Sequence, residues 1–290
     1  AHVLLALTAL LLGVAHIVGV GHYSATFWKT WLWLGIALSC LTAAVRVRLV
    51  KPLQLLRRPW RVARVIEERG SSWTLVLRPE GHGGFRYLPG QFAWLTLRSS
   101  PFAMREHPFS ISSSAATAGE ISFTIKELGD FTNRIGEIRV GETAWIDGPY
   151  GTFSIDISQA PGYVFVAGGV GIAPIMSMLR TLADRGDRRP LLLFYAYHTW
   201  ERTTFREELE ELRERIDLTV VYVLSEPPAD WEGEQGLLRE EIFARRLPAD
   251  RAARECFICG PTPMIAVAEK ALARQGIALT HIHSEIFDLV

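Results

Sequence analysis

The sequence predicts a multi-domain chain with three parts: two transmembrane α-helices, an antiparallel β-barrel, and an α/β domain built on a parallel sheet. Three observations predict this order. Two long apolar runs stand at the N-terminus, short alternating strands between glycine-rich turns follow, and from about residue 160 strands alternate with helices. We place the boundaries at 1–50 for the helices, 51–60 for a basic linker, 61–157 for the barrel and 158–290 for the α/β domain.

The composition of the 290 residues excludes several classes of protein. Basic and acidic residues number 31 each, so the chain has no positive excess, and we expect no nucleic-acid partner. Three cysteines are too few for a disulfide framework or for a four-cysteine iron–sulfur cluster. Because the chain opens on Ala1, we expect a fragment or a processed product.

The two apolar runs, Val3–Val20 and Phe27–Val45, each have the length of about 20 residues that crosses a bilayer. A signal peptide is the alternative for the first run, but that run lacks a basic n-region. A basic stretch follows the second run, and the positive-inside rule places it in the cytoplasm. We therefore expect a multi-pass protein of the cell membrane, in contact with the lipid bilayer, whose later domains are cytoplasmic. A basic linker lying on anionic lipid predicts the same topology.

Two histidines, His2 and His16, lie in the first run. Their spacing of 14 residues brings them within about 40° of one helix face and about 21 Å apart along the axis. Intramembrane polar residues are usually functional, and imidazole is a common ligand of haem iron. The spacing suits two stacked haems whose second ligands lie outside this chain, because the second run has no histidine. Alternatively, His2 is interfacial and His16 bonds a neighbouring helix.

Four short motifs lie among the expected barrel strands, and each is ordinary turn chemistry when taken alone. They are Pro89-Gly90-Gln91-Phe92, His107-Pro108-Phe109-Ser110 following Arg105, Gly129-Asp130-Phe131-Thr132, and Gly148-Pro149-Tyr150-Gly151. We expect the strands at Trp73–Leu77, Phe92–Leu97, Ile121–Ile125 and Thr143–Ile146.

Together and in this order, the motifs resemble the FAD-binding barrel of the ferredoxin-reductase family. The resemblance implies that Phe109 packs on the isoalloxazine and that Ser110 bonds near its N5. His107 stands where that family usually has an arginine, as in the His-Pro-Phe-Thr/Ser variant of membrane NADPH oxidases and ferric reductases. The resemblance also implies that Thr132 and backbone N–H groups near Gly129 receive phosphate oxygens. The other positions that it assigns to the flavin are Arg105, Pro108, Phe131 and Gly148.

A glycine-rich turn follows the first expected strand of the α/β part, Tyr163–Ala167. It consists of Gly168, Gly169, Val170, Gly171, Ile172, Ala173 and Pro174. Such a turn exposes N–H groups at a helix N-terminus, where a pyrophosphate binds without a Cβ in the way. The turn lacks the G-x-G-x-x-G fingerprint, but it is closely similar to the nicotinamide-binding motif of the reductase family. Cys259, Gly260 and Pro261, about 90 residues later, complete that resemblance.

Three residues are implied by the resemblance at the reaction centre. Cys259 would lie beside the nicotinamide C4, and Glu285-Ile286-Phe287 resembles the family's C-terminal Glu-x-Phe, in which the aromatic ring shields the flavin and the carboxylate lies near N5. The alternative for Phe287 is a core cap. Cys256 and Cys259, three apart on a strand, point to opposite faces, so we expect neither a redox pair nor a metal site from them.

The coenzyme is expected to be NADPH rather than NADH. Family members that prefer NADPH often carry an arginine where His198 stands, and Arg202 and Arg206 lie close enough in sequence to replace it. A charged helix surface explains both arginines equally well.

The whole pattern resembles a ferric-reductase or NADPH-oxidase-like membrane flavocytochrome, and the resemblance implies an enzyme. Electrons would pass from NAD(P)H through FAD to haem b, bound by His2 and His16, and on to an external acceptor such as ferric iron or oxygen. Two alternatives stay open. One is a haem-free, membrane-tethered flavin reductase that donates electrons to a protein partner, and the other is a non-catalytic redox or nucleotide sensor.

Overall fold

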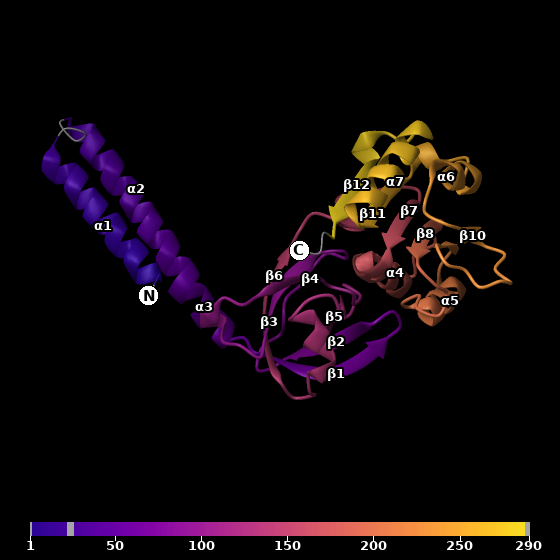
Figure 1. Cartoon of the computed structure of the whole chain (residues 1–290), viewed down its shortest axis with the longest axis horizontal. Coiled ribbons are helices and arrows are strands. Elements are labelled where there is room, and N and C mark those ends of the chain that lie inside the picture. The colour runs from indigo at the N-terminus through magenta and orange to yellow at the C-terminus, as the bar shows by residue number, and fades with distance from the viewer. Residues whose placement is uncertain (1, 22–25, 288–290) are drawn as a thin grey trace. The chain divides into compact units, whose positions relative to one another are not determined.

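The computed structural model describes residues 2–21 and 26–287, with side chains from Leu5 onward (Figure 1). The chain divides into two compact units, Ala1–Arg57 with Ser100–Arg105, and Arg58–Ser99 with Glu106–Val290. The first unit holds the N-terminal helices. The second holds both the barrel and the α/β domain, so the contacts between these two belong to one compact body.

Two long helices dominate the first unit, α1 (His2–Val20) and α2 (Phe27–Val45). The second helix continues through a π-helical turn, η1 (Arg46–Val50), into α3 (Lys51–Leu56). The Lys51 N–H donates to the carbonyl of Arg46, five residues back, and Pro52 has no N–H with which to continue a regular ladder. The expected linker is therefore helical as far as Leu56. A 3₁₀ turn, η2 (Pro101–Ala103), also belongs to this unit.

The apolar side chains of the first unit are exposed. No α2 residue is buried, and Phe27, Trp31 and Leu38 are 79%, 59% and 64% exposed. Among the described residues, one helix, Phe27–Leu56, is long and apolar enough to span a membrane, and Leu5–Val20 is a shorter apolar helix. Both predicted helices are thus present, and one of them meets the length and hydropathy expected of a span.

The barrel is a six-stranded antiparallel sheet, as predicted, with the order β4-β3-β6-β1-β2-β5. A bridge between Ile111 and Phe123 joins the β4 and β5 edges. Apolar side chains that alternate along the strands, such as Leu75, Leu77 and Leu95, are fully buried in its core. The strands are β1 (Trp60–Glu68), β2 (Ser72–Pro79), β3 (Phe92–Leu97), β4 (His107–Ser110), β5 (Ile121–Lys126) and β6 (Thr143–Tyr150).

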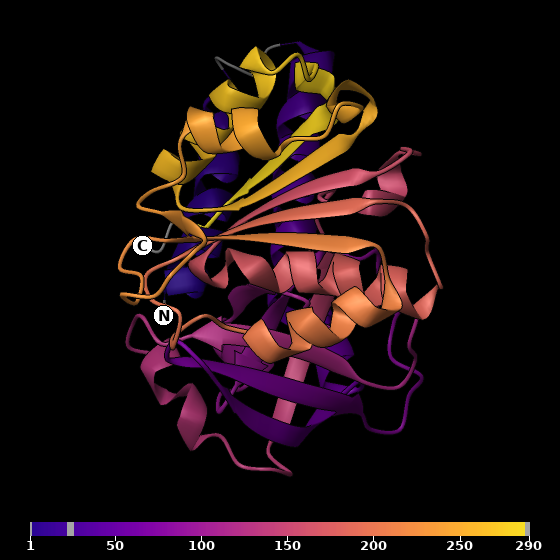
Figure 2. The same ribbon diagram turned by 90° about the vertical axis from the view of Figure 1, so that its right-hand side faces the viewer.

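The α/β domain has a six-stranded parallel sheet with the order β10-β9-β8-β7-β11-β12. Helices α4 (Ile172–Asp184) and α5 (Arg206–Arg215) cover one face, and α6 (Glu240–Arg246) and α7 (Thr262–Arg274) cover the other (Figure 2). A central strand covered on both faces reads as a continuous apolar run, which explains why every residue of β7 is buried. The strands are β7 (Tyr163–Gly168), β8 (Leu191–Tyr197), β9 (Leu218–Leu224), β10 (Glu234–Gln235), β11 (Glu255–Gly260) and β12 (Ile282–Ile286).

The chain crosses the sheet in two directions from β7. It runs outward through β8 to β9, and later returns to place β11 on the other side of β7. The β7–β11 pair is therefore the topological switch point of the sheet. Ligands bind at such a point, outside the carboxyl ends of the strands. The short 3₁₀ turns are η3 (Thr132–Glu137), η4 (Ile155–Ile157), η5 (Gly169–Gly171), η6 (Arg251–Ala253) and η7 (Leu279–His281).

Helix α5 begins at Arg206, because Phe205 before it has a left-handed φ of 60° and cannot continue a helix backwards. Cys256 and Cys259 are buried in the cores on opposite faces of the sheet, as predicted. The described residues contain no group of three or more His, Cys, Asp or Glu side chains arranged to hold a metal ion.

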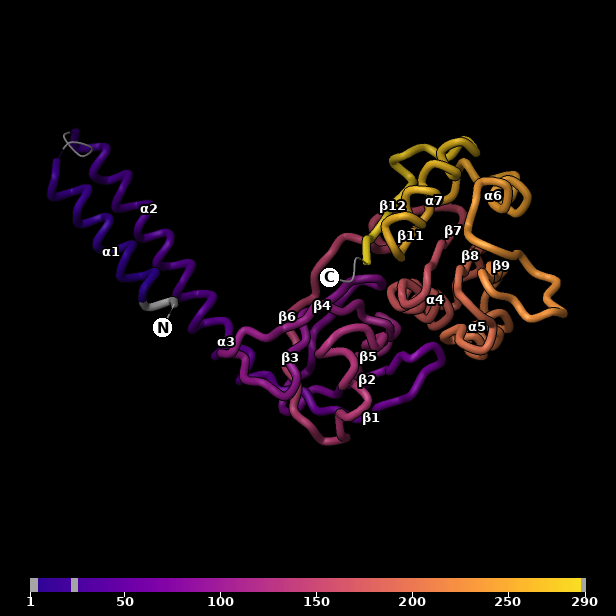
Figure 3. Tube along the Cα trace, viewed as in Figure 1, coloured from indigo at the N-terminus to yellow at the C-terminus, as the bar shows by residue number. Residues whose placement is uncertain are grey.

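The β1–β2 hairpin extends from the barrel to the α/β domain (Figure 3). The Thr204 hydroxyl donates to the carbonyl of Arg69 at the hairpin turn over 3.0 Å. A Cβ on Gly70 would lie 1.9 Å from the Tyr197 hydroxyl, so the turn packs tightly against the end of β8. The barrel and the α/β domain are therefore joined by specific contacts as well as by the chain.

Candidate functional site

Strand β4 carries a buried hydroxyl that has no partner. Ser110 pairs with Phe92 of β3, is 3% exposed, and its Oγ has no hydrogen-bond partner among the described residues. An unpaired buried hydroxyl costs about 1–3 kcal/mol, so it needs an explanation. A flavin edge placed there would supply the missing partner.

Three aromatic rings lie together, two on β4 and one at the turn that follows Gly129. His107 stacks on Phe131 with 4.0 Å between ring centroids, and Phe109 lies nearly parallel to Phe131 at 6.2 Å. Burial lowers the pKa of His107 below its ordinary value of 6.5, which favours the uncharged ring at neutral pH. His107 therefore acts here as an aromatic surface, and it does not bring the positive charge that an arginine would. Pro108 is exposed on the same strand.

The turn at Gly129 is tied to itself. The Thr132 Oγ1 accepts from the backbone N–H groups of Leu128 and Gly129, at 2.9 and 2.8 Å, and donates to the Gly129 carbonyl. These bonds shape the turn and use the hydroxyl that we expected to receive a phosphate. Any phosphate at this turn would therefore meet other N–H groups, or would have to displace the Thr132 bonds.

Two further positions assigned to the flavin have other surroundings. A Cβ on Gly148 would lie 2.7 Å from the Cβ of Ala93, so the packing of β6 on β3 already requires a glycine there. Arg105 belongs to the first unit, and its part in phosphate binding stays a prediction.

The glycine-rich turn lies between β7 and α4, as predicted, and the strand order places it at the switch point. Gly169 has a φ of +55°, which a side chain rarely adopts, and its Cβ position is open. Gly171 is different, because a Cβ there would lie 2.3 Å from the Cys259 carbonyl oxygen of β11. We expected Gly171 to admit the nucleotide, but the contact that requires a glycine at this position is with the protein's own backbone.

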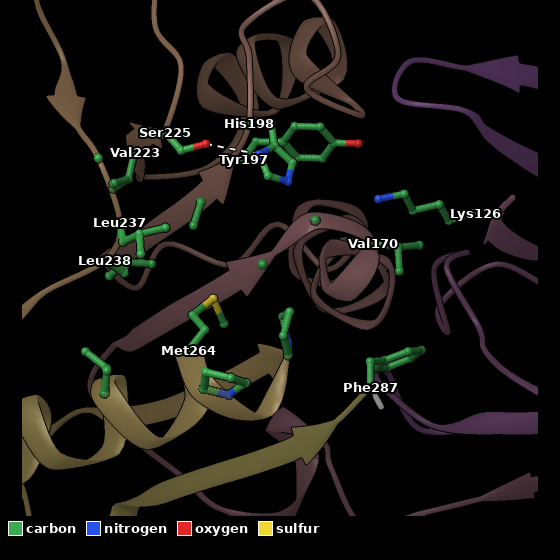
Figure 4. A pocket seen from close by; sticks show the side chains of 17 residues that line it. Lys126, Val170, Tyr197, His198, Val223, Ser225, Leu237, Leu238, Met264 and Phe287 are labelled. Atoms are coloured by element: carbon green, nitrogen blue, oxygen red, sulfur yellow. Dashed lines mark hydrogen bonds between the residues drawn. The ribbon is translucent and has the colours of Figure 1, made fainter. Parts of the chain in front are cut away.

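A cavity of about 410 Å³ opens at the carboxyl ends of β7, β8, β9 and β11 (Figure 4). It brings together the predicted Gly168, Gly169, Val170, His198, Pro261 and Phe287. Its size lies in the range of ligand pockets, and its walls are largely apolar. Ala196 and Tyr197 also line it, and they belong to the stretch with His198 where the family resemblance implies contact with the adenosine ribose. The sequence analysis did not identify the other wall residues, which are Lys126, Val223, Ser225, Gly236, Leu237, Leu238, Pro263, Met264 and Val267.

The polar groups of this cavity lie at its rim. The His198 Nδ1 and the Ser225 Oγ are 3.1 Å apart, and Lys126 points in from β5 of the barrel (Figure 4). Burial and the nearby Arg202 lower the pKa of Lys126. Arg202 itself does not line the cavity; its guanidinium donates to the Ser71 Oγ over 3.4 Å.

Arg206, the other arginine considered for the coenzyme, is held by its own surroundings. It donates to the Trp200 carbonyl and to Glu207, and its guanidinium stacks on the Trp200 ring. The interpretation of Arg206 as part of a charged helix surface fits these contacts.

Cys259 and Glu285 are neighbours across β11 and β12, where they form a register pair. Burial raises the pKa of Glu285 to about 7, and its Oε2 has no hydrogen-bond partner among the described residues. Burial, and then the Glu285 carboxylate, raise the pKa of the Cys259 thiol well above its ordinary range. The thiol is therefore neutral and is not a nucleophile. Phe287, two residues beyond Glu285 and on the same side of the strand, lines the cavity.

The described residues fit FAD and a nicotinamide dinucleotide. The unpaired Ser110 hydroxyl and the rings of His107 and Phe109 on the same strand suit an isoalloxazine. The Gly169 turn, with its open space at a helix N-terminus, suits a pyrophosphate. Gly260 and Pro261 lie next to that turn, because a Cβ on Gly168 would contact Pro261 and a Cβ on Gly260 would contact Gly168. Ile172, Ala173 and Pro174 begin α4 as buried residues.

A haem does not fit within the described residues. His16 is exposed on α1, the side chain of His2 lies outside the described part, and α2 has no histidine. The described first unit therefore offers a single axial ligand, whereas a haem b normally takes two.

Two family matches agree with this geometry. Residues 74–154 match the family described as FAD-binding domain, and residues 165–270 match the family described as Oxidoreductase NAD-binding domain. The two matches coincide with the barrel and with the α/β domain.

Similar curated proteins are reductase components. The chain is 30% identical over 235 residues to the reductase component of propane 2-monooxygenase from Rhodococcus jostii, covering 78% of this chain and 62% of that protein. It is 33% identical over 153 residues to NADH-cytochrome b5 reductase 1 of Debaryomyces hansenii, covering 52% of this chain and 54% of that protein. The chain therefore spans less than two thirds of the length of these relatives.

Solved structures share the fold. The FAD/NAD-binding domain of nitric oxide dioxygenase from Vibrio cholerae superposes with a TM-score of 0.69 at 22% identity, over 79% of this chain and 98% of that one. The cytochrome b5 reductase domain of Ulva prolifera nitrate reductase gives a TM-score of 0.67 at 19% identity, over 80% of this chain and 98% of that one.

The geometry and the matches together define a class of protein. The chain carries the FAD-binding and NAD-binding domains of a flavoprotein reductase of the ferredoxin–NADP reductase type. The relatives named above are an oxygenase reductase component and a cytochrome b5 reductase, and neither is a ferric reductase.

Proposed function

We propose that the protein is an NAD(P)H-dependent FAD reductase that is tethered to a membrane and passes electrons to a separate protein acceptor. The observation that carries the proposal is the unpaired Ser110 hydroxyl on the barrel strand β4, in the same compact unit as the dinucleotide cavity. When bound, FAD would take a hydride from the coenzyme and release single electrons. The electron-transfer components among the relatives support this class of reaction.

Each group of the site has a separate task in this proposal. The turn at Gly169 and the N-terminus of α4 bind the pyrophosphate, and Phe287 covers the cavity where the nicotinamide enters. Ser110 donates a hydrogen bond to the flavin edge. Cys259 lies next to the glycine turn and pairs with Glu285, and neither residue lines the cavity. Burial favours the neutral form of both groups, because a buried charge would be costly.

Preference for NADPH is part of the proposal, with His198 and Arg202 as the groups that would meet a 2′-phosphate. His198 lines the cavity, whereas Arg202 would first have to leave Ser71. The ratio of kcat/KM for NADPH and NADH tests the preference, and a ratio below one rejects it.

Membrane attachment rests on the first unit. The uncovered apolar side chains of α1 and α2 would be costly in water and are stable in lipid. Arg46, Arg48, Lys51, Arg57 and Arg58 follow α2 and favour the cytoplasmic side for the domains after it.

A transmembrane haem path is the second candidate. The spacing of His2 and His16 on α1 favours it, with the other axial ligands supplied from outside the described residues. In that case the acceptor lies across the membrane and is ferric iron, oxygen or another oxidant.

One spectrum separates these functions. The native protein, extracted in detergent, is scanned before and after anaerobic addition of NADPH or NADH. Bleaching of the flavin absorbance without haem bands supports the haem-free reductase, and additional sharp reduced-haem bands support the second candidate. Bound flavin that neither coenzyme bleaches rejects both and leaves the non-catalytic sensor.

A further inference from the structure

We propose that α4 is a rigid spacer that holds the Gly169 turn at a fixed distance from β4, the strand that carries Ser110. Arg180 and Thr181 are its positioning residues. The inference rests on the proposed hydride transfer. It concerns side chains that lie outside both cofactor sites.

One face of α4 is bonded to the barrel segment that follows Ser110. The Ser177 Oγ donates to the Ser113 carbonyl at 2.7 Å, and the Arg180 Nη1 donates to the Ser112 carbonyl at 2.5 Å. The Thr181 Oγ1 accepts from the backbone N–H of Ala115 at 2.9 Å. Arg180 and Thr181 lie three and four residues after Ser177, so the three contacts come from one side of α4 and bond it to one short barrel segment.

Arg180 is itself held by two other groups. Its Nε and Nη2 make a bidentate pair with the Glu208 carboxylate, both at 2.6 Å, and its guanidinium lies over the Phe205 ring at 4.9 Å. The planar fork leaves the Nη1 group for the barrel, in a direction set by the other contacts. The Arg180 side chain is 19% exposed, so water competes weakly for these bonds.

The barrel holds the same segment from its other side. The Ser112 Oγ bonds to Ser122 and Thr124, and Thr124 bonds to Thr74, at 2.9 to 3.1 Å. Ser112 is two residues from Ser110, so Ser110 has little freedom to move relative to the barrel or to the α/β domain.

The Gly169 turn lies at the N-terminus of α4, and the side of α4 is bonded to barrel residues that closely follow Ser110. Any change in the bonds between α4 and the barrel therefore changes the distance between the two cofactor positions. An error of about 1 Å in such a distance can cost roughly 100-fold in rate. Affinity for each cofactor taken separately depends on contacts that Arg180 and Thr181 do not make, so rate and affinity should respond differently.

The test compares Thr181→Val, Thr181→Ser and Arg180→Ala with Arg213→Ala, which removes an exposed α5 arginine that bonds Glu210. Valine keeps the shape of threonine but cannot accept from Ala115, whereas serine can. The measurements are the hydride-transfer rate by stopped flow, the dissociation constant of NADP⁺, the long-wavelength charge-transfer absorbance between NADP⁺ and reduced FAD, and hydrogen exchange of the Ala115 amide.

We expect Thr181→Val and Arg180→Ala to lose about 10-fold or more in hydride-transfer rate. The charge-transfer absorbance should weaken and the Ala115 amide should exchange faster, while NADP⁺ affinity stays within about twofold. Thr181→Ser and Arg213→Ala should behave like the wild-type protein. If Arg180→Ala does not fold, the Thr181 pair carries the test.

Two outcomes overturn the inference. An unchanged rate and charge-transfer absorbance in folded Thr181→Val reject it and leave the proposed function intact. A wild-type protein that binds FAD but is reduced by neither coenzyme rejects the proposed function, and this inference with it.

Discussion

The glycine turn and the buried oxygens of Ser110 and Glu285 are two parts of the same candidate site, but they are stabilised in different ways. The packing of the protein itself requires a glycine at position 171, because a Cβ there would overlap the β11 backbone. Ser110 Oγ and Glu285 Oε2 are buried without partners among the described residues. The turn is therefore complete without a cofactor, whereas the two oxygens are satisfied only if something else binds.

This difference separates stability from function. A substitution in the turn should damage the fold whether or not a nucleotide is present. A substitution that removes an unpaired oxygen should leave the fold unharmed, or improve it, and should reduce the reaction rate. The predictions below test that separation.

Gly171→Val has the largest expected effect. Its Cβ would overlap the Cys259 carbonyl, so α4 and β11 must move apart, and we expect a loss of roughly 4 kcal/mol or more in the free energy of unfolding, or no folded protein at all. Chemical denaturation of the cofactor-free protein measures it. Gly83→Val is the control, because a Cβ on Gly83 meets no atom within 4 Å. A stable Gly171→Val protein with only a lower nucleotide affinity would show that the turn is shaped for the ligand.

Glu285→Gln should change how stability depends on pH. Burial raises the folded pKa from 4.5 to about 7, so the stability that the protonated carboxyl provides is complete below pH 4.5 and is lost as the pH rises through about 7. Glutamine stays neutral throughout. The free energy of unfolding of the variant should therefore rise relative to that of the wild-type protein between pH 4.5 and 7. The difference should reach roughly 3 kcal/mol at higher pH.

Thermal or denaturant unfolding of the flavin-free protein at several pH values checks this gain. Glu211→Gln, an exposed change on α5, serves as the control and should show no such trend. A pH-independent difference between Glu285→Gln and the wild-type protein would mean that the carboxyl finds a partner in solution.

The sequence predicted the fold and the centre of the site, but it missed much of the cavity wall. Apolar runs and glycine turns have local causes, so β7, the Gly169 turn and α4 could be predicted from the chain. Ser225 could have been found from the rule that ligands meet the carboxyl ends of parallel strands, because it directly follows β9. Lys126 could not, because its place in the wall depends on how the barrel packs on the α/β domain, which no local pattern encodes.

The roles of single residues were harder to predict than their positions. Gly148 and Gly171 stand where the family resemblance puts them, yet contacts with Ala93 and Cys259 explain each glycine without a ligand. The Thr132 hydroxyl is likewise used within its own turn. Long-range packing decides which of several reasons for a residue applies, and sequence spacing carries little information about it.

Ser110→Ala has the smallest expected effect on the free energy of unfolding. It separates the role of the unpaired buried oxygens from that of the glycine turn most directly. The change removes an unpaired buried hydroxyl, so the cofactor-free protein should keep its stability or gain up to about 1 kcal/mol. If Ser110 donates to the flavin, FAD reduction by NAD(P)H should slow by about 10- to 100-fold, equivalent to about 1.4–2.8 kcal/mol. Coenzyme affinity should change little, because the cavity does not include this strand.

The matched control for Ser110→Ala is Ser158→Ala. The Ser158 Oγ is also buried without a partner among the described residues, but it lies in the loop after η4, before the amino end of β7. Both variants relieve the same kind of desolvation cost, so both should keep their stability, and only Ser110→Ala should slow flavin reduction. Equal rates in the two variants would remove Ser110 from the reaction. The unpaired hydroxyl would then be a cost of folding at this strand, as it is at Ser158.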